Sequence, residues 1–153
     1  VIRHAQALVR GAVRLGIPVV ATEQYPKALG QTAPELRQWL PDNQKYFSKM
    51  CFSALGCEPL RKSLSDTGRR QVVVTGIETH VCVMQTGLEL LAAGYSVYVV
   101  ADAVSSRKGT DRDAALKRLE KHGAELVTTE MVVFEWLRAA GTPVFKELQA
   151  LIK

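Results

Sequence analysis

The chain has 153 residues, of which 47% are hydrophobic and 23% are charged, a balance typical of an ordinary globular domain. No apolar run is long enough to cross a membrane, and no cluster of basic and aromatic residues marks a nucleic-acid-binding surface, although basic residues outnumber acidic ones by 20 to 15. We therefore predict a single domain over residues 1–153 that binds neither membranes nor nucleic acids.

Segments with helical and strand-like apolar patterns alternate along the chain. In chain order, we predict a helix over residues 2–15, a strand over 18–22, a loop over 23–30, a helix over 33–40, a strand over 45–49, a helix over 58–66, a strand over 71–75, a helix over 79–93, a strand over 96–101, a helix over 110–122, a strand over 125–127, and helices over 129–139 and 144–153. The helix over 110–122 begins with the sequence TDRD, which resembles a capping box with Asp in place of Glu.

This alternation predicts an α/β fold of three layers, in which helices cover both faces of a mostly parallel central sheet. Ligands of such sheets bind beyond the carboxyl ends of the strands, so the loops after Thr22, Ser48, Thr75 and Ala101 should converge on one site. The first predicted helix has neither a capping residue nor a preceding strand. We therefore expect a strand upstream of Val1 in the full protein.

The segment QVVVTGIETHVCV, residues 71–83, predicts a buried strand, a turn at Gly76 and a helix whose first turn carries Cys82. Backbone N–H groups at the start of a helix are unpaired, and the helix dipole favours negative charge there. A thiol in that position loses its proton more easily and becomes a better nucleophile. The sequence therefore predicts an enzyme in which Cys82 is the attacking group.

Residues 76–82, GIETHVC, resemble the nucleophile turn of the isochorismatase-like cysteine hydrolases. The chain is most similar to the isochorismatase domain-containing proteins of that superfamily, and the resemblance implies their Rossmann-like parallel sheet. Further matching segments keep the family's order over nearly the whole chain: residues 22–26 (TEQYP), 49–53 (KMCFS), 102–107 (DAVSSR) and 145–147 (FKE).

The family's catalytic set is an Asp, a Lys and a Cys. The resemblance places the Cys on Cys82 and the Lys on Lys49, whereas the Asp belongs to the strand expected upstream of Val1. It implies that the thiolate attacks a carbonyl carbon and that water hydrolyses the covalent intermediate. Backbone N–H groups of Glu78 and Cys82 would form the oxyanion hole, and the peptide bond between Ile77 and Glu78 is expected to be cis.

Three further residues are expected to line the pocket. Gln24 and Tyr25 follow a predicted strand, although an exposed loop is an equally good interpretation for them, and His80 lies near Cys82 in sequence. Nicotinamidases of the same superfamily carry an Asp and histidines as metal ligands near the second strand. The corresponding segment here contains no histidine, and the chain's three histidines show no ligand spacing. We predict neither a metal nor a cofactor.

These residues predict a hydrolase of a small amide, imide or ester, which would act on non-peptide C–N or related bonds. The resemblance also implies a homo-oligomer, for which the last predicted helix with Phe145 and Leu148 offers an apolar contact. The three cysteines are an odd number, which argues against a disulfide framework. Free thiols suit a reducing compartment, so we predict a cytoplasmic protein.

Other interpretations of the same residues stay open. Cys82 is also consistent with an inert buried thiol, because free cysteines are among the most buried residues. Lys49 is also consistent with an ordinary surface residue, because lysines are mostly exposed. The chain could accordingly be an interaction protein that keeps the fold without turnover. Thiol redox chemistry through Cys51, Cys57 and Cys82 is a weaker alternative, because no C-x-x-C pair is present.

Overall fold

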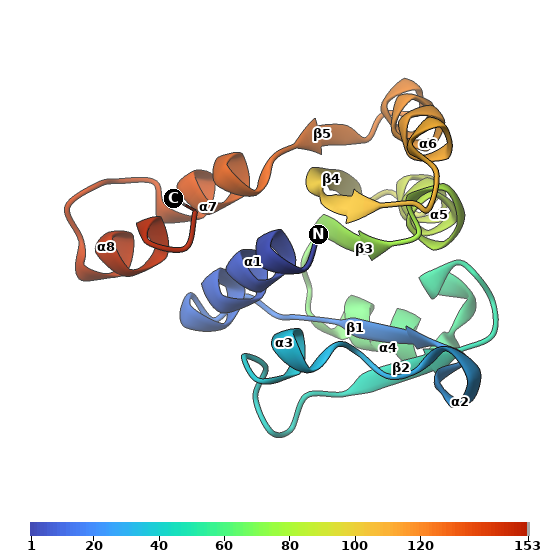
Figure 1. The fold of residues 1–153 in the computed structure, drawn as a ribbon, viewed down its shortest axis with the longest axis horizontal. Coiled ribbons are helices and arrows are strands. Elements are labelled where there is room, and N and C mark those ends of the chain that lie inside the picture. Colours follow the sequence, from blue (N-terminus) through green and yellow to red (C-terminus); the bar gives the residue numbers. More distant parts are fainter. Residues whose placement is uncertain (153) are drawn as a thin grey trace.

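The computed structural model describes residues 1–152 and shows parallel strands with helices on either side (Figure 1). Its elements are α1 (Ile2–Arg14), β1 (Ala21–Gln24), α2 (Pro26–Leu29), α3 (Pro34–Arg37), β2 (Tyr46–Lys49), the 3-10 turn η1 (Ala54–Gly56), α4 (Glu58–Asp66), β3 (Gln71–Ile77), the π-helical turn η2 (Thr79–Val83), α5 (Met84–Ala92), β4 (Ser96–Ser105), α6 (Gly109–Lys121), β5 (Glu125–Val127), α7 (Thr129–Leu137) and α8 (Pro143–Gln149). The predicted alternation of helices and strands is therefore confirmed, with α2 as an additional helical turn. Lys153, the predicted last residue of the final helix, lies outside the described residues.

The strands form two parallel sheets that are not hydrogen-bonded to each other. One has the order β3-β4-β5, and the other consists of β1 and β2. Within the smaller sheet, the register pairs Gln24 with Lys49 at the carboxyl end of both strands. In Figure 1 the arrows of β1, β2 and β3 point the same way, so their carboxyl ends face one side of the molecule.

The larger sheet carries the apolar core because the side chains of β4 alternate between its two faces. Val97 and Val99 pack with Leu90 and Leu119 of α5 and α6. Val100 belongs to a second cluster, formed with residues of α1 and α7 on the opposite face. Figure 1 shows these two helix layers on either side of β3 and β4. The fold is thus the three-layer α/β arrangement that the sequence predicted.

Besides shifts in the ends of several elements, the structure corrects the sequence analysis at two local points. The predicted loop over residues 23–30 is wrong, since Glu23 and Gln24 belong to β1 and a helical turn begins at Pro26. Pairing with β2 decides where β1 lies, and this long-range contact leaves no local sequence signal. The predicted capping box is also wrong: α6 begins at Gly109, and its N-cap residue, Lys108, provides no side-chain capping bond.

Candidate functional site

Cys82 lies on the turn that follows β3. The peptide bond between Ile77 and Glu78 is cis, at the position that the family resemblance indicated. The carbonyl of Glu78 then accepts hydrogen bonds from the N–H groups of Val81 and Val83, both at 3.2 Å, which closes the π-helical turn η2. Short π-helical segments inside helices are frequent at functional sites. Cys82 is half-buried within this turn, and α5 continues directly from it.

Lys49 is the last residue of β2, and only 5% of it is exposed. Its ammonium donates to Gln24 Oε1 at 2.6 Å, to the Phe52 carbonyl at 2.7 Å and to the Cys51 carbonyl at 3.1 Å. The Lys49 Nζ atom also lies 3.6 Å from Cys82 Sγ. The structure therefore brings together the two side chains that the sequence analysis paired, although 33 residues separate them along the chain.

Gln24, one of the predicted pocket residues, holds Lys49 in place. Its side chain accepts from Lys49 Nζ through Oε1 and donates to the Met50 carbonyl at 2.9 Å through Nε2. Tyr25 is the next residue and is 43% exposed, with a φ of 39°. A bulky side chain rarely adopts this left-handed conformation, and such strain persists only where surrounding contacts impose it. Here the N–H of Tyr25 donates to the Lys49 carbonyl at 3.0 Å.

Two hydrogen bonds that the sequence analysis did not foresee join the loop after β2 to α5. Ser53 Oγ donates to Glu89 Oε2 at 2.6 Å, and the N–H of Ala54 donates to Thr86 Oγ1 at 2.9 Å. These bonds fix the loop that supplies two of the carbonyl acceptors around Lys49. The sequence contained a signal for the part of α5 that takes part in these contacts. Thr86 and Glu89 follow Cys82 by four and seven positions, so they share its helix face.

His80, the third predicted pocket residue, contacts the loop after β4. Its Nδ1 atom lies 2.9 Å from Ser106 Oγ, which also accepts from the His80 N–H at 3.3 Å. Its Nε2 atom lies 3.9 Å from Glu78 Oε2 and 4.0 Å from Asp111 Oδ2. The other oxygen of Glu78 accepts from the Arg107 guanidinium at 3.2 Å. These polar contacts join the turn that carries Cys82 to the loop after β4.

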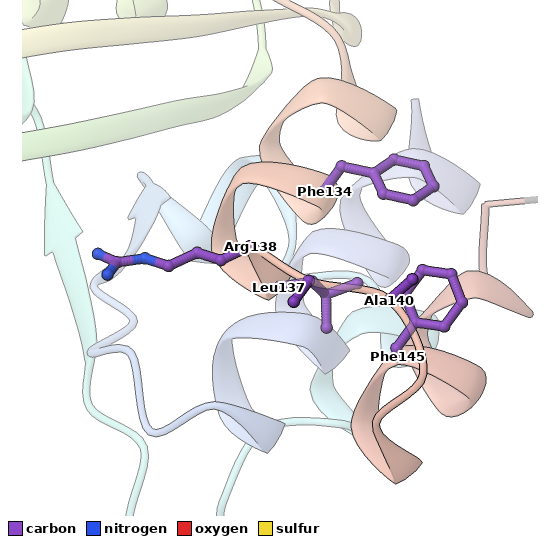
Figure 2. Close-up of a pocket in the computed structure, with 6 residues that line it drawn as sticks. Phe134, Leu137, Arg138, Ala140 and Phe145 are labelled. Atoms are coloured by element: carbon purple, nitrogen blue, oxygen red, sulfur yellow. The ribbon is translucent and has the colours of Figure 1, made fainter.

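Two cavities among the described residues are lined by residues other than Cys82 and Lys49. One cavity, of about 300 Å³, is lined by residues that include Phe134, Leu137, Arg138 and Phe145 (Figure 2). A second, of about 240 Å³, adjoins His4 and Asp102 and their neighbours. Cys82 and Lys49 line neither cavity.

Within residues 1–152, no group of three or more His, Cys, Asp or Glu side chains is placed to hold a metal ion. Across the same residues, none of the helices combines the length and the apolar character that crossing a membrane requires. All three cysteines of the described chain are free thiols.

The family model of the isochorismatase domain matches residues 1–131. Isochorismatase domain-containing protein 2 of Xenopus laevis is 43% identical over 152 residues, which cover 99% of this chain and 73% of that protein. The structure of MAR1 ribonuclease from Caenorhabditis elegans superposes with a TM-score of 0.92 at 43% identity, covering 99% of this chain and 77% of that one. The YcaC gene product of Escherichia coli, an octameric hydrolase of unknown specificity, gives a TM-score of 0.91 at 27% identity and covers 97% and 74% of the two chains. The chain spans about half of some curated relatives and about three quarters of others.

Proposed function

Because this chain belongs to the isochorismatase family, we propose that it is a cysteine hydrolase of a small amide, imide or ester, with Cys82 as nucleophile and Lys49 as its cationic partner. The observation that carries the proposal is the 3.6 Å contact between Lys49 Nζ and Cys82 Sγ. The lysine is almost completely buried at that point. A buried ammonium beside a half-buried sulfur stabilises a thiolate by direct charge attraction.

The proposed reaction has two steps. The Cys82 thiol gives up its proton, the thiolate adds to the carbonyl carbon, the bond from that carbon to nitrogen or oxygen breaks, and the leaving group departs with that proton. Water then attacks the thioester and releases the carboxylic acid and the free thiol. Backbone N–H groups of Glu78 and Cys82 are the proposed oxyanion donors, each typically worth about 3 kcal/mol of the barrier. The Asp of the family's catalytic set has no counterpart assigned within residues 1–153, so the proposal assigns this chain two of the three groups.

Alkylation of the intact protein with iodoacetamide tests the proposal, because Cys57 in the same chain serves as an internal control. Peptide mass spectrometry reports the rate at each cysteine separately. We expect Cys82 to react about tenfold faster than Cys57 or more at pH 7. The variant Lys49→Met, which keeps the length of the apolar stem but removes the charge, should slow Cys82 and leave Cys57 unchanged. Equal rates at Cys82 and Cys57 in the unmodified protein would reject Cys82 as an activated nucleophile.

A second candidate function is cleavage of RNA. A relative of 43% identity is named a ribonuclease, and this chain carries a net charge of +5. Incubation of the intact protein with an end-labelled single-stranded RNA tests this alternative, with Cys82→Ser as the matched variant. Cleavage that Cys82→Ser abolishes would assign the site to RNA. The absence of cleavage, together with fast alkylation of Cys82, supports the small-carbonyl reaction.

The third possibility, an interaction protein without turnover, predicts a slowly reacting Cys82 and no acyl transfer.

We also propose that copies of the chain assemble with one another, in line with the octameric state of the YcaC hydrolase. Light scattering of the purified protein measures this directly, and a monomeric mass would reject it. The three free thiols support a reducing, cytoplasmic location.

A further inference from the structure

Large apolar side chains are exposed at the carboxyl ends of all three strands that bear the proposed site. The exposed fractions are 43% for Tyr25, 68% for Met50, 52% for Phe52 and 67% for Ile77. We call these four residues the apolar rim. Exposed apolar side chains are normally scattered singly over a surface. Their concentration next to Cys82 and Lys49 therefore indicates a binding site for a ligand.

Each member of the apolar rim is tied to a residue of the site. Tyr25 follows Gln24 in the chain and donates its N–H to the Lys49 carbonyl, and Met50 follows Lys49 and accepts from Gln24 through its own carbonyl. The Phe52 carbonyl accepts directly from Lys49 Nζ. Ile77 forms the cis peptide bond with Glu78, one of the proposed oxyanion donors. The four residues of the rim are therefore joined, through the chain or through backbone hydrogen bonds, to the groups that act in the proposed reaction.

The buried ammonium of Lys49 is already surrounded by oxygen atoms of the protein. An ammonium group has three N–H donors, and the oxygen acceptors on Gln24, Cys51 and Phe52 already lie within 3.1 Å of Lys49 Nζ. An anionic substrate would have to displace one of these oxygen atoms to hydrogen-bond with Lys49, whereas a neutral substrate would not.

We propose that the substrate of this site is a neutral carbonyl compound with an apolar substituent, and that the apolar rim binds that substituent while Cys82 attacks the carbonyl carbon. The inference rests on the proposed hydrolase function and adds the class of substrate. Apolar walls around a few placed polar groups are the usual composition of sites for small molecules. Met50 suits such a role because its unbranched side chain adapts to ligands of different shape.

The experiment uses three maleimides that alkylate thiols: N-methylmaleimide, N-hexylmaleimide and the anionic 3-maleimidopropionate. The rate at Cys82 is divided by the rate at Cys57 for each reagent, so that intrinsic reactivity cancels. Burial of part of the hexyl chain should raise this ratio about tenfold over that of the methyl reagent. The carboxylate reagent should show no such advantage over N-methylmaleimide.

Two rim variants and one control separate the apolar rim from general hydrophobicity. Met50→Ser and Tyr25→Asn should each reduce the advantage of the hexyl reagent, and Asn tolerates the positive φ of position 25. The control is Leu29→Ser, which removes an apolar side chain that is 71% exposed at the end of α2. It should leave the hexyl-to-methyl ratio unchanged.

The outcomes distinguish this inference from the function on which it rests. If iodoacetamide alkylates Cys82 much faster than Cys57 but the hexyl and methyl reagents give equal ratios, the inference is overturned and the nucleophile stands. A faster reaction with 3-maleimidopropionate overturns it as well. If Met50→Ser changes the oligomer mass by light scattering but leaves the hexyl advantage intact, the rim is a contact between copies of the chain. Slow alkylation of Cys82 by iodoacetamide rejects the proposed function itself.

Discussion

The part of the chain that holds Lys49 and the part that holds Cys82 bury different kinds of side chain. Between residues 13 and 59, the buried residues are Glu23, Lys49 and Ser53, all polar or charged. From Leu60 onward the buried residues are mostly aliphatic and form the packed layers around β4. Hydrogen bonds thus position the cation of the site, whereas apolar packing positions the helix that carries the sulfur. The two parts should respond differently to substitution.

The largest expected effect is in the apolar part. Leu119 is fully buried and belongs to the core cluster between β4 and helices α5 and α6. Leu119→Ala should lower the free energy of unfolding by about 2–5 kcal/mol, because it removes apolar contacts and leaves a cavity. Chemical denaturation monitored by circular dichroism measures the change. The matched control, Leu29→Ala at a position that is 71% exposed, should stay within about 0.5 kcal/mol of the unmodified protein. Equal losses in the two variants would contradict the comparison.

An intermediate effect is expected where the part around Lys49 buries a charge. Glu23 accepts from the N–H and the hydroxyl of Thr32 at 2.8 and 2.9 Å, and it lies 3.6 Å from the Arg37 guanidinium. Glu23→Ala should cost about 1.5–3 kcal/mol of unfolding free energy, because these donors lose a charged acceptor. Glu58→Ala breaks an exposed ion pair with Arg61 and should cost about 0.5 kcal/mol. A cost at Glu23 as small as that at Glu58 would show that buried polar contacts do not hold this part together.

The smallest effect, of opposite sign, is expected at a buried hydroxyl on the turn that carries Cys82. Thr79 is fully buried, and its Oγ1 atom has no hydrogen-bond partner among the described residues. Thr79→Val keeps the branched shape and removes an unpaired polar group, so unfolding free energy should stay equal or rise by about 1 kcal/mol.

Thr129→Val is the matched control for that substitution. Thr129 is equally buried, but its hydroxyl donates to Asp102 Oδ1 at 2.9 Å. Loss of this bond to a charged acceptor should cost about 1.5–3 kcal/mol. Thermal unfolding of the two valine variants side by side gives the contrast. If Thr79→Val lowers the unfolding free energy as much as Thr129→Val, the Thr79 hydroxyl has a hydrogen-bond partner in solution.

Much of the fold was predictable because its signals are local. The helix over residues 58–66 and the strand over 125–127 match the structure at both ends, since apolar periodicity and breaking residues define them. The predicted strands over 71–75 and 96–101 are both too short, and the structure extends them to Ile77 and Ser105. The added residues pair β3 with β4 beyond a shift in register. No apolar pattern within either segment predicts that pairing.

The candidate site likewise has a part that local sequence predicts and a part that depends on contacts between distant segments. Cys82 was identified from a strand, a glycine turn and a helix start that are contiguous in the chain. The bonds from Gln24 to Lys49 and from Ser53 to Glu89 were not foreseen, because each joins segments at least 25 residues apart. The apolar rim was not predicted either. Met50 and Ile77 are residue types that usually lie in a protein core, and only the tertiary structure places them at the surface.

The sequence by itself determined the alternation of strands and helices, the three-layer α/β class and the position of the thiol at a helix start, because periodicity, glycine conformation and helix-end chemistry act over a few neighbouring residues. The tertiary structure alone decided that Lys49 is buried, which acceptors surround its ammonium and how far it lies from the sulfur. Those properties depend on the pairing of β1 with β2 and on the docking of the loop after β2 against α5. Contacts of that kind are set by the packing of the whole chain and not by any single segment.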